Sequence, residues 1–84
     1  MTTYVVYGIS DCPACLRACA DLMEADNEYV FVEMDFSKSY RDYIKDRHQW
    51  PTFPIIIRQS QNTTVRIGGY DQLKEYMENP GSLT

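Results

Sequence analysis

Short apolar runs alternate with amphipathic stretches along the chain, and this alternation predicts the secondary structure. A β-branched and aromatic run at residues 3–7, ended by Gly8, predicts a short and mostly buried strand. Pro13 suits the first turn of a helix, and apolar residues follow it at i, i+3, i+4 and i+7. The predicted buried stripe of this helix consists of Leu16, Cys19, Ala20 and Met23.

The same reading assigns five further elements. They are a strand at 29–35, a polar helix at about 39–47, strands at 53–58 and 64–67, and a last helix near the C-terminus. Residues 60–62 are typical of a hairpin turn between the last two strands. Asp71 is expected to cap the last helix, and residues 79–81 (Asn-Pro-Gly) to stop it. Its inward side chains are expected to be Leu73, Tyr76 and Met77.

The element order is therefore β-α-β-α-β-β-α, which is an α/β arrangement. The first half has the alternation of a parallel βαβ unit, and the second half adds an antiparallel hairpin. We expect one mixed four-stranded sheet with three helices distributed over both faces. The 84 residues suffice for one domain, placed at 1–84, without an internal repeat or linker.

Composition and charge exclude several function classes. The chain is 44% hydrophobic and 24% charged, and its net charge of −4 argues against nucleic acid or an anionic membrane as a partner. No apolar run approaches the roughly 18–20 residues that span a bilayer. Residues 1–4 lack the basic and apolar regions of a secretory signal, so we expect a cytoplasmic protein.

Three cysteines, Cys12, Cys15 and Cys19, fall within eight residues. Their odd number and close spacing exclude a disulfide framework and indicate reactive thiols or metal ligands. Cys12 and Cys15 lie at a strand-to-helix junction, where the free N–H groups and the helix dipole favour a thiolate at Cys12. The sequence therefore predicts thiol–disulfide exchange, with Cys12 as the nucleophile and Cys15 as the resolving thiol.

Other interpretations of the cysteines are weaker. A structural zinc site usually needs four ligands, and only Cys19 and the distant His48 are available to complete one, so we expect no metal. A merely packed Cys12–Cys15 pair is equally disfavoured by its position after a strand. Cys19 is better explained as a small core residue, with a regulatory thiol as the alternative.

Two later segments support redox chemistry. Thr52-Phe53-Pro54 begins a strand, and a cis proline there would leave the Phe53 backbone free to bind a peptide-like substrate. A proline that simply ends a loop explains the segment as well. Residues 68–71 (Gly-Gly-Tyr-Asp) allow close backbone approach and expose N–H groups at a helix start, which suits an anion. A plain turn followed by a helix N-cap is the alternative.

Together these segments resemble the glutaredoxin family of the thioredoxin fold, and specifically its small bacterial and bacteriophage members. The matching residues are Cys12 to Ala18, Thr52 to Pro54 and Gly68 to Asp71, and the similarity covers nearly the whole chain. The resemblance implies glutathione as co-substrate without a bound cofactor. Some relatives donate electrons to ribonucleotide reductase, which makes that enzyme a possible partner.

The resemblance also implies a glutathione groove. Phe53 would pair with the cysteinyl backbone, and Pro54 would be cis. The N–H groups of Tyr70 and Asp71 would bind the γ-glutamyl carboxylate, and the Asp71 carboxylate its ammonium group. Arg41 would bind the glycyl carboxylate, unless it belongs to a solvated helix face. The implied glutathione-binding residues are Arg41, Thr52, Phe53, Pro54, Gly69, Tyr70 and Asp71.

Several positions depart from the family pattern. Ala14 replaces a common Tyr, Ile9 and Pro51 stand where basic residues are frequent, and Asp11 puts a negative charge beside Cys12. Fewer cations make Cys12 less acidic than the family norm and weaken the case for glutathione binding. Trp50 is expected to be exposed, either in a partner surface or over the groove.

The leading hypothesis is a monomeric, glutathione-dependent dithiol oxidoreductase that reduces protein disulfides or glutathione mixed disulfides. The missing basic residues favour an alternative, a redoxin that is reduced by thioredoxin reductase and binds glutathione poorly. A third hypothesis is a dimer that binds an iron–sulfur cluster through Cys12 and glutathione. Pro13 argues against it, because cluster-binding relatives usually have a smaller residue there.

Overall fold

Seven elements make up the structure, a computed structural model that describes residues 2–79. In chain order they are β1 (Thr3–Gly8), α1 (Pro13–Glu24), β2 (Glu28–Glu33), α2 (Lys38–His48), β3 (Ile55–Ser60), β4 (Thr63–Gly68) and α3 (Tyr70–Glu78). The predicted order is confirmed, and most boundaries differ from the prediction by one or two residues.

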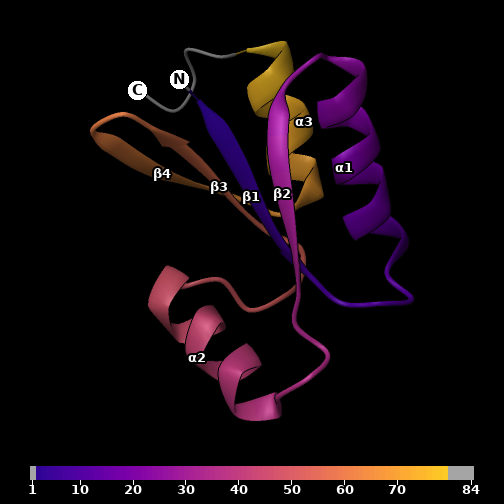
Figure 1. The fold of residues 1–84 in the computed structure, drawn as a ribbon, viewed down its shortest axis with the longest axis vertical. Helices are drawn as coiled ribbons and strands as arrows, with labels where there is room; N and C mark the ends of the chain where they lie inside the picture. Colours follow the sequence, from indigo (N-terminus) through magenta and orange to yellow (C-terminus); the bar gives the residue numbers. More distant parts are fainter. Residues whose placement is uncertain (1, 80–84) are drawn as a thin grey trace.

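The four strands form one mixed sheet in the order β2-β1-β3-β4. β1 pairs with β2 in parallel, and the β1–β3 and β3–β4 pairs are antiparallel. Helices α1 and α3 cover one face of the sheet and α2 lies on the other (Figure 1). The predicted mixed four-stranded sheet with helices on both faces is therefore confirmed.

The core is divided by the sheet into two clusters. On the side of α1 and α3 the buried residues are Tyr4, Val6, Ala18, Leu22, Ile56, Ile67 and Leu73. On the side of α2 they are Met34, Ile44, Ile55 and Ile57. The cluster under α1 and α3 is the larger one, so α2 is held by fewer buried contacts. Within residues 2–79 no helix is long and apolar enough to cross a membrane.

The buried stripe predicted for α1 is wrong. Leu16 and Met23 are 68% and 63% exposed, and Ala20 is exposed as well. The side chains that face the sheet are Cys15, Ala18 and Leu22, with Cys19 packed at their edge. Both sets of residues have helical spacing, and the contact of α1 with β1 determines which set is buried. Cys15 Sγ lies only 3.0 Å from where a Cβ on Gly8 would stand, which fixes the rotation of the helix.

The predicted start of α3 is also corrected. Gly69, not Asp71, is the N-cap, and Asp71 occupies the second helical position. The Gly69 N–H donates to Gln72 Oε1 at 3.0 Å, so a side chain one turn later satisfies the helix start. Pro80 and Gly81, predicted to stop the helix, lie outside the described residues.

Trp50 is half-buried rather than exposed, which corrects a further prediction. Its ring packs against the α2 cluster and lies over Gly68, where a Cβ would stand 3.0 Å from Trp50 Cη2. The Arg66 guanidinium lies 4.8 Å from the centre of the same ring. Trp50 therefore connects the loop after α2 to the end of β4.

Candidate active site

Three strand ends bring the predicted motifs together at one end of the sheet. Tyr7 pairs with Ile55 and Ile56 pairs with Gly68, so the end of β1, the start of β3 and the end of β4 are neighbours. The loop to Cys12 leaves β1 at this end, and Pro54 immediately precedes β3. The three segments that are separated in sequence thus meet around one surface.

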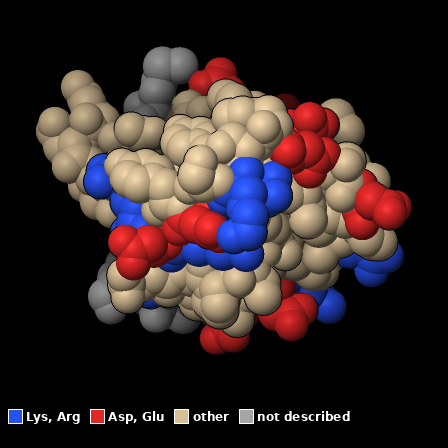
Figure 2. Space-filling view, turned by 90° about the horizontal axis from the view of Figure 1, so that it is seen from below, with Lys and Arg blue, Asp and Glu red and all other residues tan. Residues whose placement is uncertain are grey.

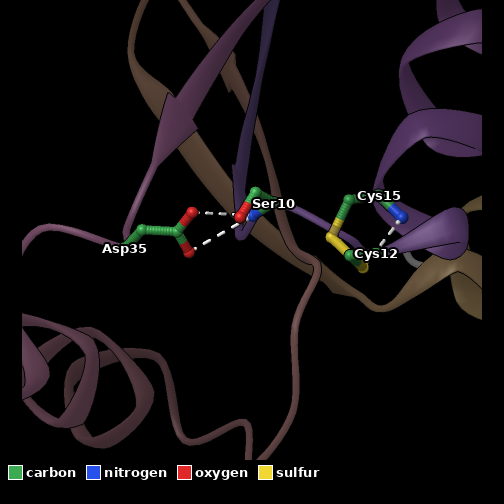
Figure 3. The surroundings of a disulfide bond; sticks show 4 residues. All are labelled: Ser10, Cys12, Cys15 and Asp35. Carbon is green, nitrogen blue, oxygen red and sulfur yellow. Dashed lines mark hydrogen bonds between the residues drawn. A yellow bond between two sulfur atoms is a disulfide. The ribbon is translucent and has the colours of Figure 1, made fainter.

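Cys12 and Cys15 form a disulfide across the first turn of α1, with their Cα atoms 5.3 Å apart (Figure 3). Cys12 is the N-cap of α1, and its Sγ accepts a hydrogen bond from the Cys15 N–H at 3.2 Å. Cys15 is fully buried, whereas Cys12 is partly exposed. An external thiol or disulfide therefore reaches Cys12, and the same N–H stabilises a thiolate there after reduction.

The loop before Cys12 is held by a residue that the sequence analysis did not identify. Both carboxylate oxygens of Asp35 accept a hydrogen bond from the Ser10 N–H, at 3.1 and 3.2 Å (Figure 3). Asp11, next in the chain, adopts a left-handed conformation with φ 57°, which Asp tolerates better than most residues. Asp35 therefore fixes the backbone from which Cys12 is presented. The only sequence signal for this role is an Asp at the end of a predicted strand, and this signal does not predict a contact with Ser10.

Asp35 gives a prediction on stability and rate. Asp35→Ala should lower the free energy of unfolding by about 1 kcal/mol, because the Ser10 N–H loses its protein acceptor. Exchange at Cys12 should slow severalfold since the loop loses its anchor. Urea unfolding and stopped-flow exchange measure the two effects. Asp35→Asn, which keeps one acceptor oxygen, should restore most of the rate, and equal rates for the Ala variant and the wild type would contradict the anchoring role.

Arg41 lies in α2 and is partly buried. Its Nη1 donates to the backbone oxygens of Met34 and Asp35, both at 3.0 Å. Arg41 thus fixes the backbone of Asp35, which in turn holds Ser10. A contact between Arg41 and a glycyl carboxylate stays a prediction, because both of these hydrogen bonds go to backbone oxygens of the protein itself.

The Phe53–Pro54 peptide bond is cis, as the resemblance implied. Pro54 is buried, Phe53 is half-buried and Thr52 is exposed, so this segment turns at the surface beside the end of β1. Lys45 Nζ lies 5.3 Å from the centre of the Phe53 ring. The Phe53 side chain therefore contacts Lys45 of α2. The Phe53 backbone lies two residues before Ile55, the first residue of β3.

Gly69, Tyr70 and Asp71 form the start of α3. A Cβ on Gly69 would stand 3.7 Å from the Pro54 carbonyl oxygen, so the two loops lie against each other. The Tyr70 hydroxyl donates to Asp21 Oδ2 at 2.7 Å, and this bond to a carboxylate raises the pKa of Tyr70. Asp71 is exposed. The side chain of Tyr70 thus points to α1, and its N–H belongs to the positive end of α3.

Cys19 is the one free thiol among the described residues. It is half-buried against the α1–α3 cluster, and burial raises its pKa. This agrees with a packing role, since a thiol with a raised pKa is a poor nucleophile. Within residues 2–79, no group of three His, Cys, Asp or Glu side chains could hold a metal ion.

Comparison with known proteins is consistent with this geometry. A glutaredoxin family model matches residues 4–61, which include the cysteine pair and the cis proline. The solution structure of a glutaredoxin from Brucella melitensis is 24% identical, with a TM-score of 0.71, and the similarity covers 99% of this chain and 85% of that one. The crystal structure of glutaredoxin 1 from Francisella tularensis complexed with cacodylate is 16% identical, with a TM-score of 0.61 and coverage of 95% and 96%. The comparison with curated proteins gives no match.

Proposed function

The chain belongs to the glutaredoxin family and is a thiol–disulfide oxidoreductase with the redox pair Cys12 and Cys15; on this premise we propose that it reduces protein disulfides or glutathione mixed disulfides at the expense of glutathione. The observation that carries the proposal is the cysteine pair itself. One sulfur is reachable at a helix start and the other is buried behind it. Such a pair separates the attacking thiol from the resolving one.

The proposed reaction has two exchange steps. The Cys12 thiolate attacks one sulfur of a substrate disulfide, forms a mixed disulfide and displaces the other substrate sulfur as a thiolate, which takes up a proton. Cys15 loses its proton and attacks the Cys12 sulfur. This closes the Cys12–Cys15 disulfide and releases the second substrate thiol. Two electrons pass to the substrate, and two glutathione molecules return the enzyme to the dithiol while forming glutathione disulfide.

Glutathione would lie against the surface formed by the three motifs. The N–H groups of Tyr70 and Asp71 at the positive end of α3 suit the γ-glutamyl carboxylate, and exposed Asp71 suits its ammonium group. The backbone of Phe53 would pair with the cysteinyl residue of glutathione, and Thr52, Pro54 and Gly69 would shape the groove. Arg41 would contact the glycyl carboxylate through the donors that its two backbone contacts leave free.

The test is turnover of a glutathione mixed disulfide in the presence of glutathione, glutathione reductase and NADPH. We expect loss of NADPH absorbance that depends on enzyme concentration. An Asp71→Asn variant should raise the KM for glutathione severalfold while kcat changes little, because a charged contact at the binding step is lost. Absence of turnover by the wild type would overturn glutathione dependence.

A second candidate function is reduction by thioredoxin reductase with poor glutathione binding. The observation in its favour is the charge around Cys12, where Asp11 is adjacent and the family's basic residues are missing at Ile9 and Pro51. Reduction of insulin disulfides with NADPH and thioredoxin reductase, without glutathione, would support it. In either case we propose a monomeric, cytoplasmic enzyme, with ribonucleotide reductase among its possible protein substrates.

A further inference from the structure

Three aromatic side chains are exposed in a row that begins just before α2 and continues to the middle of this helix. Phe36, Tyr40 and Tyr43 are 68%, 39% and 53% exposed. The rings of Phe36 and Tyr40 are 5.5 Å apart between centroids, and those of Tyr40 and Tyr43 stack at 5.9 Å. Isolated exposed apolar residues are common, but a contiguous aromatic group on one face indicates a surface that another molecule covers.

This aromatic row begins beside the catalytic loop. Phe36 follows Asp35, whose carboxylate holds the Ser10 N–H two residues before Cys12. A polypeptide that is attacked by Cys12 can therefore continue onto Phe36 and along α2. The row lies beside the groove proposed for glutathione, which the cis-proline loop, the start of α3 and Arg41 of α2 would form, and none of its three rings is assigned to that groove.

The other end of the row leads into a basic hollow. Arg47 follows Tyr43 by four residues, about one turn of α2, and both Arg47 and His48 line this hollow. The ring of Tyr7, near the end of β1, lies 5.6 Å from that of His48. The hollow is lined by Arg47, His48, Ile57, Thr64 and Arg66. Arg66 is positioned there by the face of the Trp50 ring.

The charges around the aromatic row and the basic hollow favour a binding partner that is acidic. α2 carries four Lys or Arg and two Asp, a net charge of +2 in a chain whose net charge is −4. Lys38 pairs with Asp42, but among the described residues no carboxylate lies within ion-pair distance of Arg47 or Arg66. Figure 2 looks onto the α2 end of the molecule, where Lys and Arg side chains gather in the middle of the face, interrupted by acidic ones.

We propose that the aromatic row and the basic hollow form one docking surface for an extended, acidic segment of the protein whose disulfide Cys12 reduces. The inference rests on the proposed exchange at Cys12. α2 is about 15 Å long, a distance that roughly five residues of extended chain span. Apolar side chains of this segment would cover Tyr40 and Tyr43, and its carboxylates would pair with Arg47 and Arg66.

The experiment compares two synthetic peptides that share one intramolecular disulfide. One has a tail of Asp, Glu and Phe, and its twin has Lys in place of every acidic residue. The protein is reduced in advance and freed of reductant, and stopped-flow fluorescence follows a single turnover. The acidic peptide should react about tenfold faster at low ionic strength, and the difference should shrink at about 0.5 M salt.

Variants separate docking from chemistry. Tyr40→Ala, and Arg47→Gln combined with Arg66→Gln, should each slow the acidic peptide about tenfold. Both should react with the disulfide of a small uncharged thiol within twofold of the wild type. Met23→Ala and Lys74→Gln are the matched controls, since they remove an exposed apolar side chain from α1 and an exposed charge from α3. Thermal unfolding verifies that every variant is folded.

Three results would overturn the docking surface. The first is equal reaction of the two peptides. The second is a loss in the variants that is as large for the small disulfide as for the acidic peptide. The third is a concentration-dependent dimer in sedimentation that Tyr40→Ala abolishes, which would assign the surface to a second copy of the chain. The single turnover requires no glutathione, so a failure of glutathione dependence would leave this measurement valid.

Discussion

Replacing Cys12 by Ser should reduce every thiol–disulfide exchange of the protein to the uncatalysed background. The reason is chemical: a serine hydroxyl is not ionised near neutral pH and forms no disulfide, so neither the attack nor the mixed disulfide is possible. The structure leaves no substitute, because Cys15 is fully buried and Cys19 is half-buried with a raised pKa. The measurement is turnover of both a protein disulfide and a glutathione mixed disulfide.

Cys15→Ser is the matched control, since it removes a sulfur from the same turn of α1. It should keep the reactions that pass only through a mixed disulfide of Cys12 with glutathione, and lose those that need closure of the Cys12–Cys15 disulfide. Residual exchange by Cys12→Ser would contradict the assigned roles. Loss of both reactions in Cys15→Ser would exclude the route through a monothiol.

The order of the elements could be predicted because it depends on local patterns. Each signal involves only a few neighbouring residues and predicts the element that they form. Examples are the apolar run before Gly8, the proline after Cys12 and the hairpin turn at 60–62. The function of the cysteine pair could also be predicted from the sequence, since few other residues at a strand-to-helix junction have the chemistry of two thiols. These features needed no knowledge of the distant contacts.

The sequence analysis erred or missed a contact where the burial or hydrogen bonding of a residue depends on another residue far away in the sequence. Leu16 and Cys15 both begin stripes of helical spacing on α1, and only the close approach of Cys15 to Gly8 selects the buried one. The contact of Asp35 with Ser10 depends on the parallel register of β1 and β2, which pairs Gly8 with Glu33. Trp50 is half-buried because it covers Gly68, a residue 18 positions later. No pattern within one segment contains such contacts.

Gly68→Ala should destabilise the fold by about 2–4 kcal/mol, since two costs combine at this position. Gly68 has φ +120°, a conformation that side chains other than glycine rarely adopt. A Cβ there would also stand 3.0 Å from Trp50 Cη2 and 3.1 Å from Gln72 Cγ. Because Gly68 ends β4 just before α3, the variant should also weaken the proposed glutathione site. Urea unfolding measures the first effect and the KM for glutathione the second.

Gly69→Ala provides the control one residue away. Gly69 has φ −92° in an extended conformation, and a Cβ there would stand 3.2 Å from Gln72 Oε1. This atom ends a flexible side chain, so a shift of a few tenths of an ångström relieves the contact and keeps its hydrogen bond to the Gly69 N–H. The cost of Gly69→Ala should stay below about 1 kcal/mol. Trp50→Ala combined with Gly68→Ala should be less destabilising than the sum of the two single variants, because removal of the ring relieves the steric part but not the backbone part. If Gly68→Ala were as mild as Gly69→Ala, neither the positive φ nor the contact with Trp50 would constrain this turn, and the strand end would be free to adjust.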